Sequence, residues 1–237
     1  AAALTTAQVQ ALTATQLQAM ETRDLAAFTT AQVRALTSDQ FQALTTEQIK
    51  GLSSAQVEAL ETQDLVALTT AQIRALDASD LALLSTEQLQ VLTTAQVEAL
   101  TTEQIVKLTT EQVSKLTIAQ LQALTTEQMA AMQGVDVASL TTAQVAALTT
   151  AQIAELELAD LQGMSSAQLV ALTTAQIRAL SPSQIAALGT AQVRALETVD
   201  VAALTSDQLA ALSTAQVQAL TTAQIIALTT GQAAALE

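Results

Sequence analysis

The stretch LSPSQIAALGTAQVRAL, Leu180–Leu196, contains Pro182, the only proline of the 237-residue chain, among residues that favour helices. Inside a continuous helix a proline costs about 3 kcal/mol, whereas at the first helical position its missing N–H has no partner to lose. Ser181, directly before it, is a preferred N-cap residue. The stretch therefore predicts that a helix begins at Pro182 and that Leu180 lies before its start.

The pattern around Pro182 recurs every eight residues along the chain. From Ala3 the sequence divides into 29 octads without an insertion or a deletion, from ALTTAQVQ, Ala3–Gln10, to ALTTGQAA, Ala227–Ala234. Eight residues turn a straight helix by about 800°, so the leucines of successive octads would share no face of one long helix. Coiled coils need repeats of seven or eleven, and Ala and Gln are poor strand formers. We therefore predict one short helix, about two turns long, per octad.

Each octad carries a signal for the start of a helix. In Leu4-Thr5-Thr6-Ala7-Gln8-Val9, Thr5 and Gln8 form the capping-box pattern, in which each side chain bonds to the backbone N–H of the other residue. Leu4 and Val9 have the spacing of a hydrophobic staple across the cap. The cap residue is Ser or Thr in 22 of the 29 octads, and the box residue is Gln in 23 and Asp in six. This agreement in phase predicts a helix break before every cap.

Charged residues follow the same period. Acidic groups stabilise helix N-termini and basic groups stabilise C-termini. Of the 22 acidic residues, 18 occupy the cap or the first three helical positions of their octad. Seven of the eight basic residues lie in the predicted last turn: Arg34, Lys50, Arg74, Lys107, Lys115, Arg178 and Arg194. A chain without a helix break every eight residues would have no reason to sort its charges in this way.

Helices of this length are not stable alone in water, because an isolated helix needs about 12–15 residues. We therefore predict an all-α fold, an α-solenoid or superhelical rod of about 29 short capped helices around one aliphatic core. The repeat array runs as a single domain over residues 1–237. Both Phe and all four Met fall on the predicted core positions: Phe28, Phe41, Met20, Met129, Met132 and Met164. The core positions show no odd–even alternation, so the number of helices per superhelical turn stays open.

Composition argues against several classes of function. The net charge of −14 disfavours nucleic acid and anionic membrane surfaces, which attract basic proteins. No run approaches the roughly 18 apolar residues that a membrane span needs. The chain has no His, Cys or Tyr, so the usual general bases and thiol nucleophiles are missing. We expect no enzyme activity, no catalytic, cofactor-binding or metal-binding residues, no cofactor, no membrane insertion and no small-molecule substrate.

Six octads depart from the consensus together. Asp replaces the box Gln at Asp24, Asp64, Asp80, Asp136, Asp160 and Asp200, and the caps of these octads are Glu21, Glu61, Asp77, Gln133, Glu157 and Glu197. One hypothesis is a calcium site, because Ca²⁺ prefers several carboxylate oxygens. The other, which we favour, is a different capping arrangement in which Asp accepts free N–H groups at the helix start. Two acidic groups per octad, without a Gly-rich loop, provide few ligands for calcium.

Pairs of threonines would form ladders if the helices stack in register. Examples are Thr69-Thr70, Thr93-Thr94 and Thr149-Thr150. One hypothesis is an ice-binding face, because regular Thr arrays on a rigid scaffold can match ordered water. The other, which we favour, is that the first Thr caps the helix and the second is a tolerated, exposed residue. The second position also holds Ile118, Gly134, Leu158 and Pro182, a variation that disfavours a lattice-matching surface.

The repeated LTTAQV and LTTAQI units resemble the octapeptide arrays of very large, repetitive bacterial surface and adhesin-like proteins, which include haem utilisation or adhesion proteins. The similarity covers the whole chain and carries no catalytic or binding residues. It implies a secreted or surface-displayed spacer. We therefore expect an extracellular or bacterial cell-surface location.

The chain is best interpreted as a structural protein, an extracellular spacer, stalk or filament-forming scaffold. A calcium-dependent adhesin repeat and an ice-binding Thr array are the alternatives. Solenoids need polar capping units at their ends, and the octads at both ends of this sequence follow the consensus. We expect either a segment of a longer array or copies that stack head to tail on themselves.

Overall fold

A computed structural model describes residues 3–236 of the chain. These residues form short α-helices joined by turns, and no strand occurs among them. The helices divide into two compact units, the first extending to Leu124 and the second beginning at Thr125. The all-α repeat fold predicted from the octads is confirmed.

The described residues contain one helix per octad. In the first unit the helices are α1 Thr6–Gln10, α2 Ala14–Ala19, α3 Thr22–Ala26, α4 Thr30–Arg34, α5 Ser38–Ala43, α6 Thr46–Lys50, α7 Ser54–Glu58, α8 Thr62–Ala67, α9 Thr70–Ala75, α10 Ala78–Leu81, α11 Thr86–Gln90, α12 Thr94–Glu98, α13 Thr102–Lys107, α14 Thr110–Lys115 and α15 Ile118–Ala123. In the second unit they are α16 Thr126–Ala130, α17 Gly134–Ser139, α18 Thr142–Ala147, α19 Thr150–Ala154, α20 Leu158–Gly163, α21 Ser166–Val170, α22 Thr174–Ala179, α23 Pro182–Ala187, α24 Thr190–Ala195, α25 Thr198–Ala203, α26 Ser206–Ala210, α27 Thr214–Ala219, α28 Thr222–Ile226 and α29 Thr230–Ala234.

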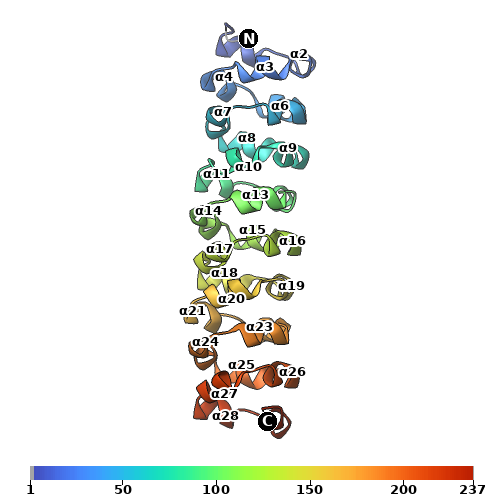
Figure 1. Ribbon diagram of the computed structural model, residues 1–237. Helices are drawn as coiled ribbons and strands as arrows, with labels where there is room; N and C mark the ends of the chain where they lie inside the picture. The colour runs from blue at the N-terminus through green and yellow to red at the C-terminus, as the bar shows by residue number, and fades with distance from the viewer. Residues whose placement is uncertain (1–2, 237) are drawn as a thin grey trace. The chain divides into compact units, whose positions relative to one another are not determined.

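Three octads make one turn of the solenoid within each unit. In the first unit, each helix packs on the helix three positions earlier, as α5 does on α2 and α9 on α6. Figure 1 shows α4 and α7 along one side of this unit and α6 and α9 along another. The second unit repeats the arrangement, with α20 packed on α17 and α27 on α24. The number of helices per turn, which the sequence left open, is therefore three.

The helices begin as the capping boxes predict. At α6, Thr45 N–H donates to Gln48 Oε1 over 2.9 Å and Gln48 N–H donates to Thr45 Oγ1 over 3.2 Å. Pro182 is the first residue of α23, and Ser181 directly before it is the N-cap, whose Oγ accepts from the Gln184 N–H. The helix starts inferred from the proline and the capping boxes are therefore confirmed.

The helices are shorter than the two turns expected from the octad. They span four to six residues, which is less than two turns at 3.6 residues per turn. The reason lies in the joints: between α5 and α6, both Leu44 and Thr45 are extended, with φ and ψ of −63° and 143° and of −74° and 158°. Two extended residues leave at most six of the eight for a helix.

The core of each unit consists of two apolar residues per octad. In α13, for example, Ile105 on the helix and Leu108 directly after it are both buried. Such residues are the predicted staple and last-turn positions. Phe28, Phe41, Met129, Met132 and Met164 are buried as expected, whereas Met20 is only half-buried. The aliphatic core therefore follows the octad pattern.

Candidate functional site: the buried glutamine and aspartate positions

The box glutamine does more than cap its own helix. In α13, Gln104 Oε1 accepts from the Thr101 N–H over 2.9 Å. Its Nε2 donates to Ile73 O over 2.9 Å and to Leu76 O over 2.8 Å, at the C-terminal end of α9. We call this combination of a box bond with donation to the helix four positions earlier the glutamine clasp.

The glutamine clasp satisfies backbone groups that short helices leave unpaired. The last four carbonyls of any helix have no partner inside it, and in helices of four to six residues these are most of the carbonyls. Nε2 donates to carbonyls 28, 30 or 31 residues earlier in both units, at Gln40, Gln48, Gln56, Gln72, Gln88, Gln96, Gln104, Gln112, Gln120, Gln168, Gln176, Gln184, Gln192, Gln208, Gln216, Gln224 and Gln232. One side chain per octad thus pairs groups at the start of one helix and at the end of another.

Sequence reasoning missed the glutamine clasp, although a signal for it was present. A capping box works with Glu as well as with Gln, because only the side-chain oxygen is needed. The box residue of this chain is Gln or Asp and never Glu. The avoidance of Glu indicates that the amide N–H₂ group of Gln has a role beyond the box bond.

A second set of long side chains caps helices in the next turn. Arg34 Nε donates to Ala59 O and Arg74 Nε donates to Ala99 O, each over 3.1 Å. Gln18 Nε2 makes the same contact with Ala43 O over 2.9 Å. In each case the acceptor lies 25 residues later, at the end of the helix packed three positions further on. Arg34 and Arg74 therefore lie in the last turn of their own helix and also bond to a C-terminal carbonyl of a neighbouring helix.

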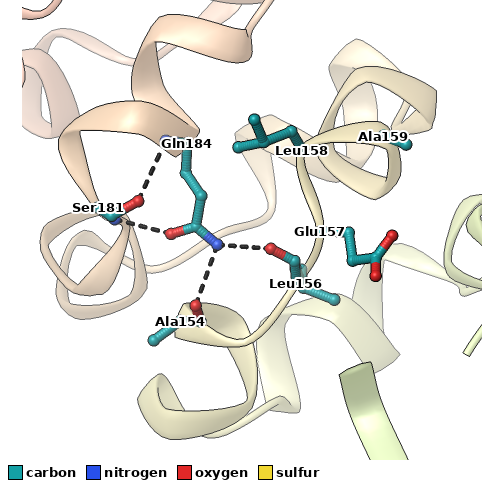
Figure 2. A pocket seen from close by; sticks show the side chains of 7 residues that line it. All are labelled: Ala154, Leu156, Glu157, Leu158, Ala159, Ser181 and Gln184. Atoms are coloured by element: carbon teal, nitrogen blue, oxygen red, sulfur yellow. Dashed lines mark hydrogen bonds between the residues drawn. The ribbon is translucent and has the colours of Figure 1, made fainter. Parts of the chain in front are cut away.

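One glutamine clasp, that of Gln184, lines an open depression of about 490 Å³ in the second unit. In Figure 2, Gln184 Nε2 donates to Leu156 O over 2.7 Å and to Ala154 O over 3.1 Å, while its Oε1 accepts from the Ser181 N–H. The polar atoms of Gln184 are therefore occupied by the fold itself. Glu157 is the one charged side chain in the lining of this depression. A ligand in this depression would mainly contact apolar side chains and polar atoms that are already hydrogen-bonded within the protein.

The aspartates that replace the box glutamine bond in two ways. Asp64 and Asp160 accept from the N–H of their own cap residues, Glu61 over 3.2 Å and Glu157 over 2.8 Å. The Oδ1 atoms of Asp80 and Asp200 accept a hydrogen bond from a hydroxyl group on the helix three positions earlier. The donors are Ser54 to Asp80, over 2.6 Å, and Thr174 to Asp200, over 2.9 Å. Asp24 is half-buried and Asp136 is buried.

The described residues give the calcium hypothesis no cluster of ligands. Residues 3–236 bring together no group of three or more acidic side chains that could hold a metal ion. In the octad of Asp24, the cap residue Glu21 instead forms an exposed ion pair with Arg23, at 2.7 Å. The capping interpretation accounts for Asp64 and Asp160, and the hydroxyl bonds account for Asp80 and Asp200. Cation binding stays the alternative hypothesis, which a calcium titration of the melting temperature can test.

Burial changes the acidity of three of these aspartates. It raises the pKa of Asp64 to about 6, against the opposing effect of the Glu61 N–H and with a smaller contribution from the Glu61 charge. Burial likewise raises the pKa of Asp160, near Glu157. It also raises the pKa of Asp200, although the Thr174 hydroxyl acts in the opposite direction. These carboxyl groups hold their protons more tightly than exposed aspartates do.

Because each helix packs on the helix three positions earlier, the helices of a unit form three stacked columns. Each residue at a first helical position therefore belongs to one of three columns. Gly134, Leu158 and Pro182 begin α17, α20 and α23, which pack on one another in a single column of the second unit. In that unit, the corresponding residues of the other two columns are all Thr or Ser. The variation that disfavoured an ice-binding face is thus confined there to one side. Packed helices lie about 8–10 Å apart, which separates successive hydroxyls of a column widely. Ice binding stays an alternative hypothesis, which a measurement of thermal hysteresis can test.

The comparison with family models identifies the repeat. A model described as the ALTTAQ repeat matches seven times, at residues 17–54, 57–94, 75–110, 86–118, 153–190, 185–214 and 209–237, and these segments cover most of the chain. The chain belongs to the ALTTAQ repeat family. The octads between the matched segments keep the same capping, for example Thr141 N–H to Gln144 Oε1 over 2.7 Å. A search of curated proteins found no match to this ALTTAQ repeat chain. Among its described residues, no helix has both the length and the apolar character needed to cross a membrane.

Proposed function

We propose that this ALTTAQ repeat protein is a structural spacer, displayed outside the cell or on its surface, whose length is set by the number of octads. The observation that carries the proposal is the glutamine clasp. Consensus octads of both units make the same donor and acceptor contacts, as at Gln104 and Gln176, so further turns can be added without new types of contact. The length of such an array therefore increases with the number of octads.

The surface of the chain is consistent with a spacer. Binding hot spots favour Trp, Tyr and Arg, whereas this chain has no Trp or Tyr and exposes mainly Thr, Ala and Glu or Gln side chains. The proposal includes no catalytic activity, because a chain without His, Cys or Tyr lacks the usual general bases and nucleophiles. Surface location and head-to-tail association of copies stay predictions, supported by the resemblance to bacterial surface arrays.

The spacer proposal predicts that length changes in equal steps. The chain has no cysteine, so spin labels can be placed at two exposed positions of the second unit with Glu127→Cys and Gln218→Cys. Deleting residues 149–172 removes three octads, and duplicating them adds three. We expect the label distance to fall or rise by about one helix layer, 8–10 Å, with a similar urea midpoint in all three proteins.

The unaltered protein with the same two labels is the reference for both length variants. Pulsed electron spin resonance measures the distances, and circular dichroism follows the unfolding. Unequal steps, or a deletion variant that no longer unfolds cooperatively, would contradict the spacer proposal. Either result would mean that particular octads are required for a purpose other than length.

A further inference from the structure

The glutamine clasp is interrupted where Asp64 occupies the box position of α8. The carbonyls four helices earlier belong to Val33, Arg34 and Leu36 at the end of α4. A box glutamine would donate to them, but Asp64 has no amide group. Among the hydrogen bonds of the described residues, no other side-chain donor reaches these three carbonyls. The end of α4 therefore lacks the donor that the equivalent helices have.

Asp64 itself has an unsatisfied oxygen. The residue is 1% exposed, and Oδ2 accepts from the Glu61 N–H over 3.2 Å. Oδ1 is buried and has no hydrogen-bond partner within residues 3–236. In Asp80 and Asp200 the corresponding Oδ1 accepts from a hydroxyl 26 residues earlier, but Ser38, at that spacing from Asp64, makes no such bond. An ionised carboxylate at this site is thus incompletely solvated by the protein.

No positive charge on the helices packed around α8 compensates Asp64. The helices α5 and α11 pack against α8 and carry the acidic residues Asp39 and Glu87, both exposed, and no Lys or Arg. On α4, the Arg34 guanidinium donates to Ala59 O. On the Asp64 octad itself, Glu61 adds a further negative charge. The surroundings therefore favour the neutral acid over the carboxylate.

We propose that Asp64 holds a proton in the folded chain, that this proton supplies a donor toward the end of α4 in place of the glutamine amide, and that its loss loosens α8 from the preceding turn. Asp64 then takes the place of the clasp glutamine only while its carboxyl group is protonated. This inference concerns the response of the array to pH and holds whether or not the chain acts as a spacer.

The direction of the pH effect follows from the two states of the chain. Asp64 has a pKa of about 6 when folded and an ordinary value of 3.8 when unfolded. Its protonation therefore stabilises the fold fully below about pH 4, and this stabilisation is lost as the pH rises through about 6. Between pH 4.5 and 7.5, this one group should increase the unfolding equilibrium constant about twentyfold.

The variant Asp64→Gln restores the consensus clasp and removes the titrating group. Urea unfolding at pH 4.5 and 7.5, followed by circular dichroism, compares the unaltered protein, Asp64→Gln and the control Asp39→Asn, which removes an exposed acid from the same unit. The ratio of unfolding constants, unaltered protein over Asp64→Gln, should rise about twentyfold between the two pH values. The ratio against Asp39→Asn should stay within about twofold.

Three results would overturn the proposal. One is an Asp64→Gln protein with the same pH dependence as the unaltered chain, and another is an Asp39→Asn protein that loses as much of it. The third is recovery of the pH 4.5 stability at pH 7.5 on adding millimolar Ca²⁺ to the unaltered protein, which would assign the site to a metal ion. If Asp64→Gln does not fold, Asp64→Asn, which is neutral and the same size, answers the same question.

Discussion

Replacing Gln104 with Glu is expected to lower the free energy of unfolding of the first unit by about 2–4 kcal/mol at pH 7. Glutamate keeps the oxygen that accepts from the Thr101 N–H. It loses the Nε2 donor to Ile73 O and Leu76 O, and it places a buried negative charge against those carbonyls. Urea unfolding followed by circular dichroism measures the change.

The matched control is Gln16→Glu in α2. Gln16 makes the same box bond with the Thr13 N–H, over 2.9 Å, but it is exposed and its Nε2 has no hydrogen bond among the described residues. We expect this variant to change stability by less than about 1 kcal/mol. If the two variants were equally destabilised, the box bond rather than the donation to α9 would carry the effect, and the clasp would be unimportant.

Replacing Phe41 with Ala is expected to lower the free energy of unfolding of the first unit by about 3–5 kcal/mol. Phe41 on α5 is 0% exposed and is the largest fully buried side chain of the described core. Its removal leaves a cavity, because neighbours fixed by capping and clasping on both sides cannot collapse into the space. A solenoid turn contacts only its neighbours, so the loss is concentrated in the surrounding turns.

The control for Phe41 is Val66→Ala, three octads later on α8. Val66 is 47% exposed, so removing two methyl groups from it should cost less than about 0.5 kcal/mol. Hydrogen exchange measured by mass spectrometry separates the two cases, because Phe41→Ala should increase exchange in α2, α5 and α8 before other helices. Equal losses of stability in the two variants would show that the stability of an octad does not depend on the burial of its apolar side chains.

The local structure could be predicted from the sequence because the residues that start each helix lie within its own octad. Thr45 and Gln48 form the box as their spacing indicates, and Pro182 begins a helix as its missing N–H requires. Short-range rules of this kind need only neighbouring residues. The burial of Phe41 followed from the same register.

The arrangement of helices around the solenoid could not be predicted in the same way. Nearly identical octads give no signal that distinguishes two helices per turn from three, because the number depends on how each helix packs on another 24 residues away. The two bonding modes of the aspartates depend on it as well. Asp80 bonds to Ser54, and that residue becomes its neighbour only once the turn is known.

Hydrolysis of a glutamine side-chain amide yields glutamate, so the Gln104→Glu variant is also the product of chemical ageing at that position. Water must reach the amide for this reaction, and Gln104 is 2% exposed. Its equivalents in other octads, such as Gln176 and Gln208, are buried to the same degree. The burial that places these amides against the carbonyls of another helix also shields them from the water that would hydrolyse them.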